Sequence, residues 1–388
     1  MQLLAGAWDS LVHVLTLLKD YGFWFLVFLT VLVFVHELGH YLVARRNGVR
    51  VEVFSIGFGP ELFGWYDRAG TRWKVSAIPL GGYVKMFGDA DASSMPGAAV
   101  ATMSEAERAV SFHHKRLGQR AAIVAAGPAA NFLFAIVLLA GLFVLVGQPF
   151  TAPEVDSVLP GSAAEAAGIR SGDVFVRIDG EGIQRFEEIQ RIVQMSPAKP
   201  LAVTIRRDGG EVALTMTPRS SEVTDRLGHK RQIGVIGIRN TKMQVVQHGP
   251  LDALWQASRE TVGISVATLK AVGEMIAGTR TTEELGGPLR IAQMSGEVGR
   301  STIESKIWFV AVLSINLGLI NLFPIPVLDG GHLLMYVAEA LRGRPLGPKA
   351  LEYTSVVGLT LVLALMVFAT WNDLVHLKVV DFIGSLLG

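Results

Sequence analysis

Four long apolar runs dominate the pattern of hydrophobic and polar positions along the chain. Each run has roughly the 20 residues that a helix rising about 1.5 Å per residue needs to cross the hydrocarbon core of a bilayer. They cover residues 21–44, 120–146, 306–324 and 354–371. The pattern predicts a polytopic α-helical membrane protein with about four transmembrane helices.

A fifth stretch, Thr261–Gly278, is apolar on one face only and contains Lys270 and Glu274. Charged side chains are costly in hydrocarbon, so we expect an amphipathic helix lying in the membrane interface. It belongs to a linker, residues 246–305, that we predict to be helical and extracytoplasmic.

Basic residues near the ends of the apolar runs predict the orientation. Residues 45–120 are rich in Lys and Arg, whereas residues 1–20 contain only Lys19. The positive-inside rule therefore places 45–120 in the cytoplasm, and alternate crossings place 147–305 outside. The first 20 residues lack a basic start and a cleavage signature, so we expect no removable signal peptide.

Short β-rich segments lie between the first two apolar runs. Val51–Phe58 and Arg72–Lys85 contain β-branched and aromatic residues interrupted by glycines, which predicts one or two β-hairpins close to the membrane. The following stretch, Asp89–Val100, is rich in Ala, Ser, Asp and Gly, and we expect a mobile loop there.

Residues 153–219 form a separate block with closely spaced turns. The order PGSAAEAAGI followed by GDVFVRIDG resembles a PDZ domain, a small α+β fold, although an unrelated α+β domain is the alternative. We assign 147–245 to one extracytoplasmic PDZ domain. A PDZ fold binds extended peptides by adding them as a strand to a sheet edge.

Composition narrows the classes of protein and of site. Half of the 388 residues are apolar and only 18% are charged, too few for an ordinary soluble enzyme. The net charge of +1 gives no overall basic field, so we expect no nucleic-acid partner. Because the chain has no cysteine, any metal must be held by His and carboxylate side chains.

The strongest chemical signal is His36-Glu37-Leu38-Gly39-His40, at the end of the first apolar run. Its two imidazoles lie one helical turn apart on one face, where both can bind one zinc while Glu37 takes a proton from water. The motif also occurs by chance, and the alternative is a solvated helix end after Val35. Its depth in an apolar run favours a functional site.

A catalytic zinc commonly has three protein ligands, so a third must come from elsewhere. Asp329 is the candidate, because it follows the third apolar run and two prolines, Pro324 and Pro326, which break the helix. Such broken backbone is tolerated in a membrane only where it is buried in protein or lines a cavity. The alternative for Asp329 is a helix cap or turn acid, and we interpret His332 as an interfacial polar residue.

Together, HELGH and NLFPIPVLDGGH at 321–332 resemble the site-2 intramembrane metalloproteases, specifically their regulator-of-sigma-E protease branch. The supporting segments are GFGP at 57–60, GPAAN at 127–131 and SINLGLIN at 314–321. The resemblance implies that His36, His40 and Asp329 bind Zn²⁺ and that Glu37 is the general base.

The resemblance also implies a substrate-binding wall and a cellular setting. Asn321, Pro324 and Pro326 would shape the wall, and Asn316 would contact the unwound peptide. Expected substrates are single-pass membrane proteins, such as trimmed anti-sigma factors in a stress response, or remnant signal peptides. The expected location is the bacterial inner membrane, with the PDZ domain in the periplasm and the site toward the cytoplasm. Some family members have two PDZ domains, so the single one leaves double-PDZ gating in doubt.

The predicted organisation is a membrane catalytic half (1–146), the PDZ domain, the linker, and a C-terminal membrane half (306–388). We expect edge strands near Gly57, Gly59 and residues 78–84 to pair with the unwound substrate. Two other functions remain possible from the sequence. One is a non-catalytic PDZ scaffold with a structural zinc, and the other is an ion-coupled transporter that uses His36, Glu37 and Asp329 as a relay.

Overall fold

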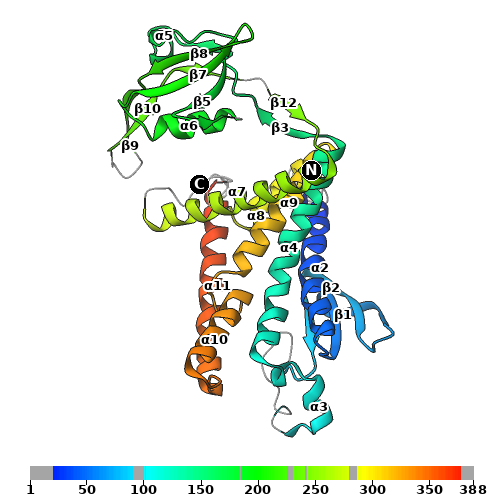
Figure 1. Cartoon of the computed structure of the whole chain (residues 1–388). Coiled ribbons are helices and arrows are strands. Elements are labelled where there is room, and N and C mark those ends of the chain that lie inside the picture. The colour runs from blue at the N-terminus through cyan, green and yellow to red at the C-terminus, as the bar shows by residue number, and fades with distance from the viewer. Residues whose placement is uncertain are drawn as a thin grey trace, which may run out of the picture. The chain divides into compact units, whose positions relative to one another are not determined.

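The computed structural model describes residues 21–90, 100, 102–183, 185–224, 230–240, 243–278 and 286–376. The chain divides into two compact units (Figure 1). Unit 1 comprises Met1–Ala140, Leu254–Thr268 and Glu283–Gly388, and unit 2 comprises Gly141–Ala253 and Leu269–Thr282. The expectations for the first 20 residues and for most of the loop 89–100 fall outside the described residues.

Unit 1 contains the four helices of the described chain that are long and apolar enough to cross a membrane. They are α2 (Phe23–Arg46), α4 (Leu117–Leu145, whose last residues belong to unit 2), α9 (Ile303–Asn321) and α11 (Pro348–His376). Each overlaps one predicted apolar run. The third run was predicted to reach residue 324, but α9 ends at Asn321 because Pro324 removes a backbone donor and restricts the residue before it.

Close helix contacts bring α2, α4 and α9 together. A side chain at Gly39 of α2 would clash with the Ala126 carbonyl of α4. A Cβ at Gly318 of α9 would lie 3.1 Å from the Pro128 carbonyl of α4. Small residues allow this approach, since every added carbon would separate the backbones.

Two long strands form the predicted hairpin region. The first half of β1 (Val51–Tyr66) pairs with both ends of β2 (Arg72–Met86): Phe54 is opposite both Trp73 and Val84. The ribbon therefore folds back on itself and makes one small sheet rather than a flat hairpin. Gly57 and Gly59, with φ of 87° and 84°, allow the sharp bends. Phe54 is fully buried against this sheet and α2.

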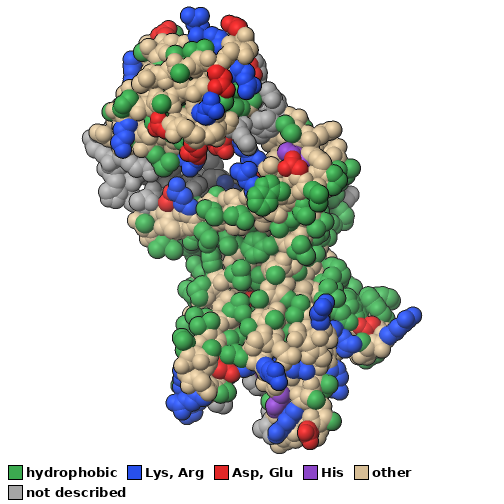
Figure 2. All heavy atoms as spheres, in the orientation of Figure 1, with side chains coloured by type: hydrophobic (Ala, Val, Ile, Leu, Met, Phe, Trp, Pro, Cys, Tyr) green, Lys and Arg blue, Asp and Glu red, His purple; other side chains and the backbone are tan. Residues whose placement is uncertain are grey.

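Shorter helices complete unit 1. They are α3 (Glu105–Val110), a 3₁₀ turn (Phe112–His114), α8 (Pro288–Gly299) and α10 (Asp329–Arg342). Figure 2 shows hydrophobic side chains over the sides of the unit's helices, with Lys and Arg gathered toward the end at which α3 and α10 lie. That distribution is the one expected of helices whose sides contact lipid.

Unit 2 is built around a four-stranded antiparallel sheet in the order β6-β5-β7-β8. The strands are β5 (Val174–Ile178), β6 (Glu181–Gly182), β7 (Leu201–Arg207) and β8 (Gly210–Met216). The helices α5 (Ala163–Ala166) and α6 (Phe186–Gln194) contribute to one core, in which Phe175, Ile189 and Ile205 are almost fully buried. The unit thus has its own hydrophobic core, as an independent domain does.

Three strand pairs complete unit 2: β3 (Gln148–Thr151) with β12 (Met243–Val246), β4 (Ser157–Val158) with β11 (Ile238–Arg239), and β9 (Arg219–Thr224) with β10 (Lys230–Val235). After them, α7 (Pro250–Ile276) starts before the predicted Thr261 and supplies residues to both units. The interfacial placement of α7 stays a prediction.

Candidate metal centre

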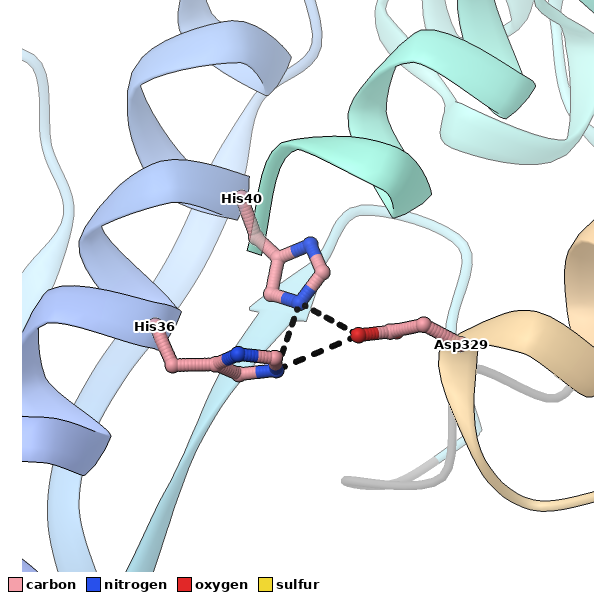
Figure 3. Close-up of side chains that lie close together, drawn as sticks. All are labelled: His36, His40 and Asp329. Atoms are coloured by element: carbon pink, nitrogen blue, oxygen red, sulfur yellow. Dashed lines mark hydrogen bonds and ion pairs between the residues drawn. The ribbon is translucent and has the colours of Figure 1, made fainter. Parts of the chain in front are cut away.

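Helix α2 presents His36 and His40 on one face, and α10 begins with Asp329 opposite them (Figure 3). The two Nε2 atoms lie 3.2 Å apart. Asp329 Oδ2 lies 3.2 Å from Nε2 of His36 and 3.5 Å from Nε2 of His40. The histidines are 9% and 8% exposed, so three ligand-type atoms converge in a nearly buried space.

The spacing of these three atoms fits a zinc ion. A point equidistant from them lies about 1.9 Å from each, slightly less than the roughly 2.0–2.1 Å of a Zn–N bond. The spacing is therefore close to that expected of three ligands of one zinc ion. Two imidazoles and a carboxylate are also a donor set that zinc prefers.

The outer nitrogens of both imidazoles contact α4. His40 Nδ1 lies 2.9 Å from the Ile123 carbonyl oxygen, which fixes the proton on Nδ1 and leaves Nε2 free to bind a metal. The His36 Nδ1 lies 3.2 Å from the carboxamide of Asn131. Gly127, on the same helix, lies against both rings: a Cβ there would clash with His40 Nε2 and lie 2.9 Å from His36 Cε1.

A compact turn between α9 and α10 positions Asp329. Side chains at Gly330 and Gly331 would clash with the carbonyl oxygens of residues 322, 323 and 325. Val327 is in the left-handed region, with φ of 84°, an uncommon conformation for a β-branched residue. The prolines and glycines of this segment therefore determine where Asp329, the third donor residue, begins α10.

An ion pair attaches α10 to α4. Arg120 donates to Glu339 at 2.5 Å, and its guanidinium lies 4.9 Å from the centre of the Tyr336 ring. Both side chains of the pair are largely buried, at 15% and 16% exposed. The helix that carries Asp329 is thus fixed on the helix that contacts both imidazoles.

A cavity of about 700 Å³ opens beside the three donor atoms. Its lining includes Glu37, Asn321, Val327, His332 and Tyr336, and the strand residues Gly82, Tyr83 and Val84. Glu37 accepts a backbone hydrogen bond from Val84, and a Cβ at Gly82 would lie 3.3 Å from Glu37 Cγ. The edge of the β1–β2 sheet therefore forms one wall of the cavity next to this carboxylate.

Of the other predicted site residues, some line this cavity and others lie outside its lining. Asn321 lines it and donates to the Leu317 carbonyl at 3.0 Å. Pro324 and Pro326 form the turn before α10, where Pro326 packs closely on Gly358 of α11. Gly57 and Gly59 bend the sheet but are outside the cavity lining, and Asn316 instead accepts from Thr268 at 3.2 Å.

Some residues of the cavity and metal centre had no role in the sequence-based prediction, among them Gly127, Asn131 and Tyr336. The first two lie in GPAAN, which served only as evidence of resemblance. A signal was present, because a polar Asn inside an apolar run needs a buried partner. Tyr336 gave no comparable signal, because a tyrosine in a helix that follows a turn is common without a role in a site.

A paired-histidine helix completed by a carboxylate, in a cavity among membrane-length helices, defines a class of membrane-embedded metallopeptidase. Comparison with known proteins gives the family. Residues 24–365 match peptidase family M50, and the chain belongs to that family.

Curated relatives cover almost the whole chain. A protein of Rhizobium meliloti (strain 1021) with a provisional zinc metalloprotease name is 48% identical over 90% of this chain and 95% of its own length. Metalloprotease MmpA of Caulobacter vibrioides is 38% identical over 92% of this chain and 96% of its own length. The protein is accordingly a zinc metalloendopeptidase of a membrane, as predicted.

Among solved structures, the PDZ domain of the SdrC-like protein from Listeria monocytogenes is 16% identical and covers 24% of this chain and 88% of its own length. Its TM-score is 0.19, too low to bear on the fold of unit 2. The PDZ assignment thus stays a prediction from the turn sequence.

Proposed function

We propose that this enzyme cuts the transmembrane segments of single-pass membrane proteins, such as trimmed anti-sigma factors or remnant signal peptides. One observation carries the proposal: the metal-donor cluster is buried between helices of membrane length and faces a cavity, rather than lying on a water-exposed surface. A substrate reaching such a site would come from within the bilayer.

The proposed ligands are His36, His40 and Asp329. A zinc held by them would activate a water molecule and polarise the scissile carbonyl group. Glu37, in the wall of the same cavity, takes the proton from the attacking water and returns it to the leaving amine. The hydrogen bond from Val84 holds this carboxylate against the sheet.

The edge of the β1–β2 sheet is the proposed substrate-binding element. A peptide bond in a transmembrane helix is shielded by the helix's own hydrogen bonds, so the substrate must be extended before it is cut. Gly82–Val84 pair with β1 on one side and line the cavity on the other. An extended substrate can add to this edge as a further strand and meet Glu37. Asn321, Pro324 and Pro326 would shape the opposite wall.

Unit 2 is proposed to be a PDZ domain on the periplasmic side of the inner membrane, with the metal centre toward the cytoplasm. The basic residues near α3 and α10 support this orientation through the positive-inside rule. The domain would read a peptide end or exclude substrates with a large outer part.

The roles of Glu37 and Asp329 are separable by experiment. Glu37→Gln should lower cleavage of a single-span reporter by about 10²–10⁴-fold while zinc content is unchanged, because only proton transfer is lost. Asp329→Ala should lose both zinc and activity. Metal analysis of both purified variants beside the cleavage assay distinguishes these outcomes.

The same variants test the competing functions. A non-catalytic scaffold with a structural zinc would keep its biological function in Glu37→Gln. An ion-coupled transporter would carry protons across liposome membranes even after zinc is removed by a chelator. Either result would overturn the protease proposal.

A further inference from the structure

Asn131 of α4 is completely buried and contacts His36 on the imidazole nitrogen that faces away from Asp329. The carboxamide nitrogen lies 3.2 Å from Nδ1 of His36. Its Oδ1 is buried and has no hydrogen-bond partner among the described residues. A buried carboxamide oxygen without a partner costs about 1–3 kcal/mol, which indicates that another arrangement completes this contact.

Metal binding at Nε2 of His36 determines which hydrogen-bond partner its Nδ1 needs. When Nε2 gives its lone pair to a metal, a neutral imidazole carries its proton on Nδ1 and needs an acceptor there. The carboxamide nitrogen is also a donor, so it cannot accept that proton. Rotating the Asn131 carboxamide by about 180° exchanges the positions of its nitrogen and oxygen. After this rotation Oδ1 faces Nδ1 of His36 and accepts a hydrogen bond from the Nδ1–H group.

His40 already has the equivalent contact. Its Nδ1 lies 2.9 Å from the Ile123 carbonyl oxygen, an acceptor that no rotation can turn into a donor. Ile123 and Asn131 are about two turns apart on the same helix. One face of α4 therefore carries both groups that contact the outer nitrogens of the two imidazoles.

A third helix holds Asn131 in place. The hydroxyl of Ser314 on α9, itself fully buried, donates to the Asn131 backbone carbonyl at 2.8 Å. The side chain is thus directed at His36 from a backbone that two helices fix.

We infer that Asn131 is a positioning residue of the zinc centre: its carboxamide oxygen accepts the hydrogen bond from Nδ1–H of His36. This bond holds the tautomer and ring orientation in which His36 presents Nε2 to the metal. The inference rests on the proposed ligand set, and it assigns no contact between Asn131 and substrate.

Zinc affinity tests the inference without relying on activity. The full-length protein and its variants are titrated with a chelator, and bound zinc is measured. Asn131→Leu, which has no acceptor, should bind zinc about 10–100-fold more weakly. Asn131→Asp, which offers only acceptors, should stay close to wild type. Ser295→Ala is the control: it removes a buried hydroxyl that donates to the Ile291 carbonyl oxygen within α8, and it should leave zinc affinity unchanged.

Two results would overturn the inference. One is wild-type affinity in Asn131→Leu, and the other is an equal loss in Asn131→Asp, which would mean that the carboxamide donates to Nδ1. The d–d absorption bands of cobalt-substituted protein give a second readout, because a reoriented His36 shifts them even where the metal is retained. His36→Ala in the same series must lose zinc, and if it does not, the ligand set itself is wrong.

Discussion

At the scale of single residues, glycines determine how closely the proposed metal ligands approach the neighbouring helix. Gly127 leaves the space that both imidazoles occupy against α4, and Gly39 lets the two helix backbones meet one turn away. Neither residue contributes a functional group. The space that they leave is nevertheless required, because a Cβ at either position would clash with an imidazole or with the facing helix.

Gly127→Ala should therefore displace an imidazole and lower zinc affinity by about 10–100-fold, since the new methyl group would overlap His40 Nε2. Gly141→Ala is the control, because it lies on the same helix and a Cβ there meets nothing within 4 Å. Chelator titration of the two variants gives the comparison. Equal zinc affinities in the two variants would show that α4 can shift to accommodate the methyl group without displacing the histidines.

Much of the site was predictable at this scale, and the reason is local geometry. The two histidines share one helical face because they are four residues apart, with Glu37 beside them, and Asp329 was the acid that follows broken backbone. The contacts of Asn131 and Gly127 depend on which face of α4 is turned toward α2. That orientation follows from tertiary packing, which periodicity in a uniformly apolar helix does not encode.

At the scale of elements, the β1–β2 sheet lines the cavity with the Gly82–Val84 edge of β2, and both of its strands pack against α2. The sequence predicted strands and turns there but not the double pairing of Phe54, because non-local register depends on the glycine bends. Val75, which pairs inside the sheet with Ile56 and Phe63, is thus a poorer probe of substrate pairing than Val84.

Val84→Pro should abolish cleavage with zinc content unchanged, because it removes the backbone donor that faces Glu37 and the cavity. Val84→Ala keeps this donor while removing most of the side chain, and it should retain most activity. Reporter cleavage and metal content are measured for both. Full activity in the proline variant would contradict strand addition at this edge.

The turn of the same sheet is attached to α2 through Asp67. Burial raises the pKa of this carboxyl group, but hydrogen bonds from Tyr41, Trp73 and the amides of Thr71 and Ala69 outweigh it and lower the pKa to about 2. A carboxyl group with a pKa below its unfolded value of 3.8 stabilises the fold above that pH and loses this contribution as the pH falls toward 2.

Amide protection in the turn should accordingly decrease between about pH 4 and pH 2, because the N–H groups of Ala69 and Thr71 both donate to Asp67 Oδ1. Hydrogen exchange of the peptide spanning 66–73 measures it. In Asp67→Asn the protection should be lower throughout and lose this pH dependence. An unchanged pH profile in the variant would exclude Asp67 as the cause.

At the scale of the whole molecule, the two units have separate cores, so one can be removed to test the other. Thr151 of β3 and Met243 of β12 are paired neighbours, which makes 153–240 a segment whose flanking ends already lie together. The shorter block 153–219 would be a poorer choice, because its removal deletes β4 and leaves β11 without its partner strand.

Deleting 153–240 should increase cleavage of substrates with an intact outer domain by about 10-fold, a coupling of about 1.4 kcal/mol. Cleavage of substrates already trimmed should stay the same, because the metal centre lies in unit 1. The ratio of the two rates in membranes is the measurement. An unchanged ratio would argue against a selective role for unit 2.

His40 and Asp329 come from opposite ends of the chain, and their meeting has a consequence for biosynthesis. The ribosome delivers the first two helices long before Asp329, so a nascent chain at that stage holds Glu37 and both histidines without the third proposed ligand. With the proposed ligand set, proteolytic competence begins only after Asp329, in roughly the last sixth of the chain, has been added. A zinc ion held by the three proposed ligands would close a very long loop and act as a removable crosslink between the two membrane halves.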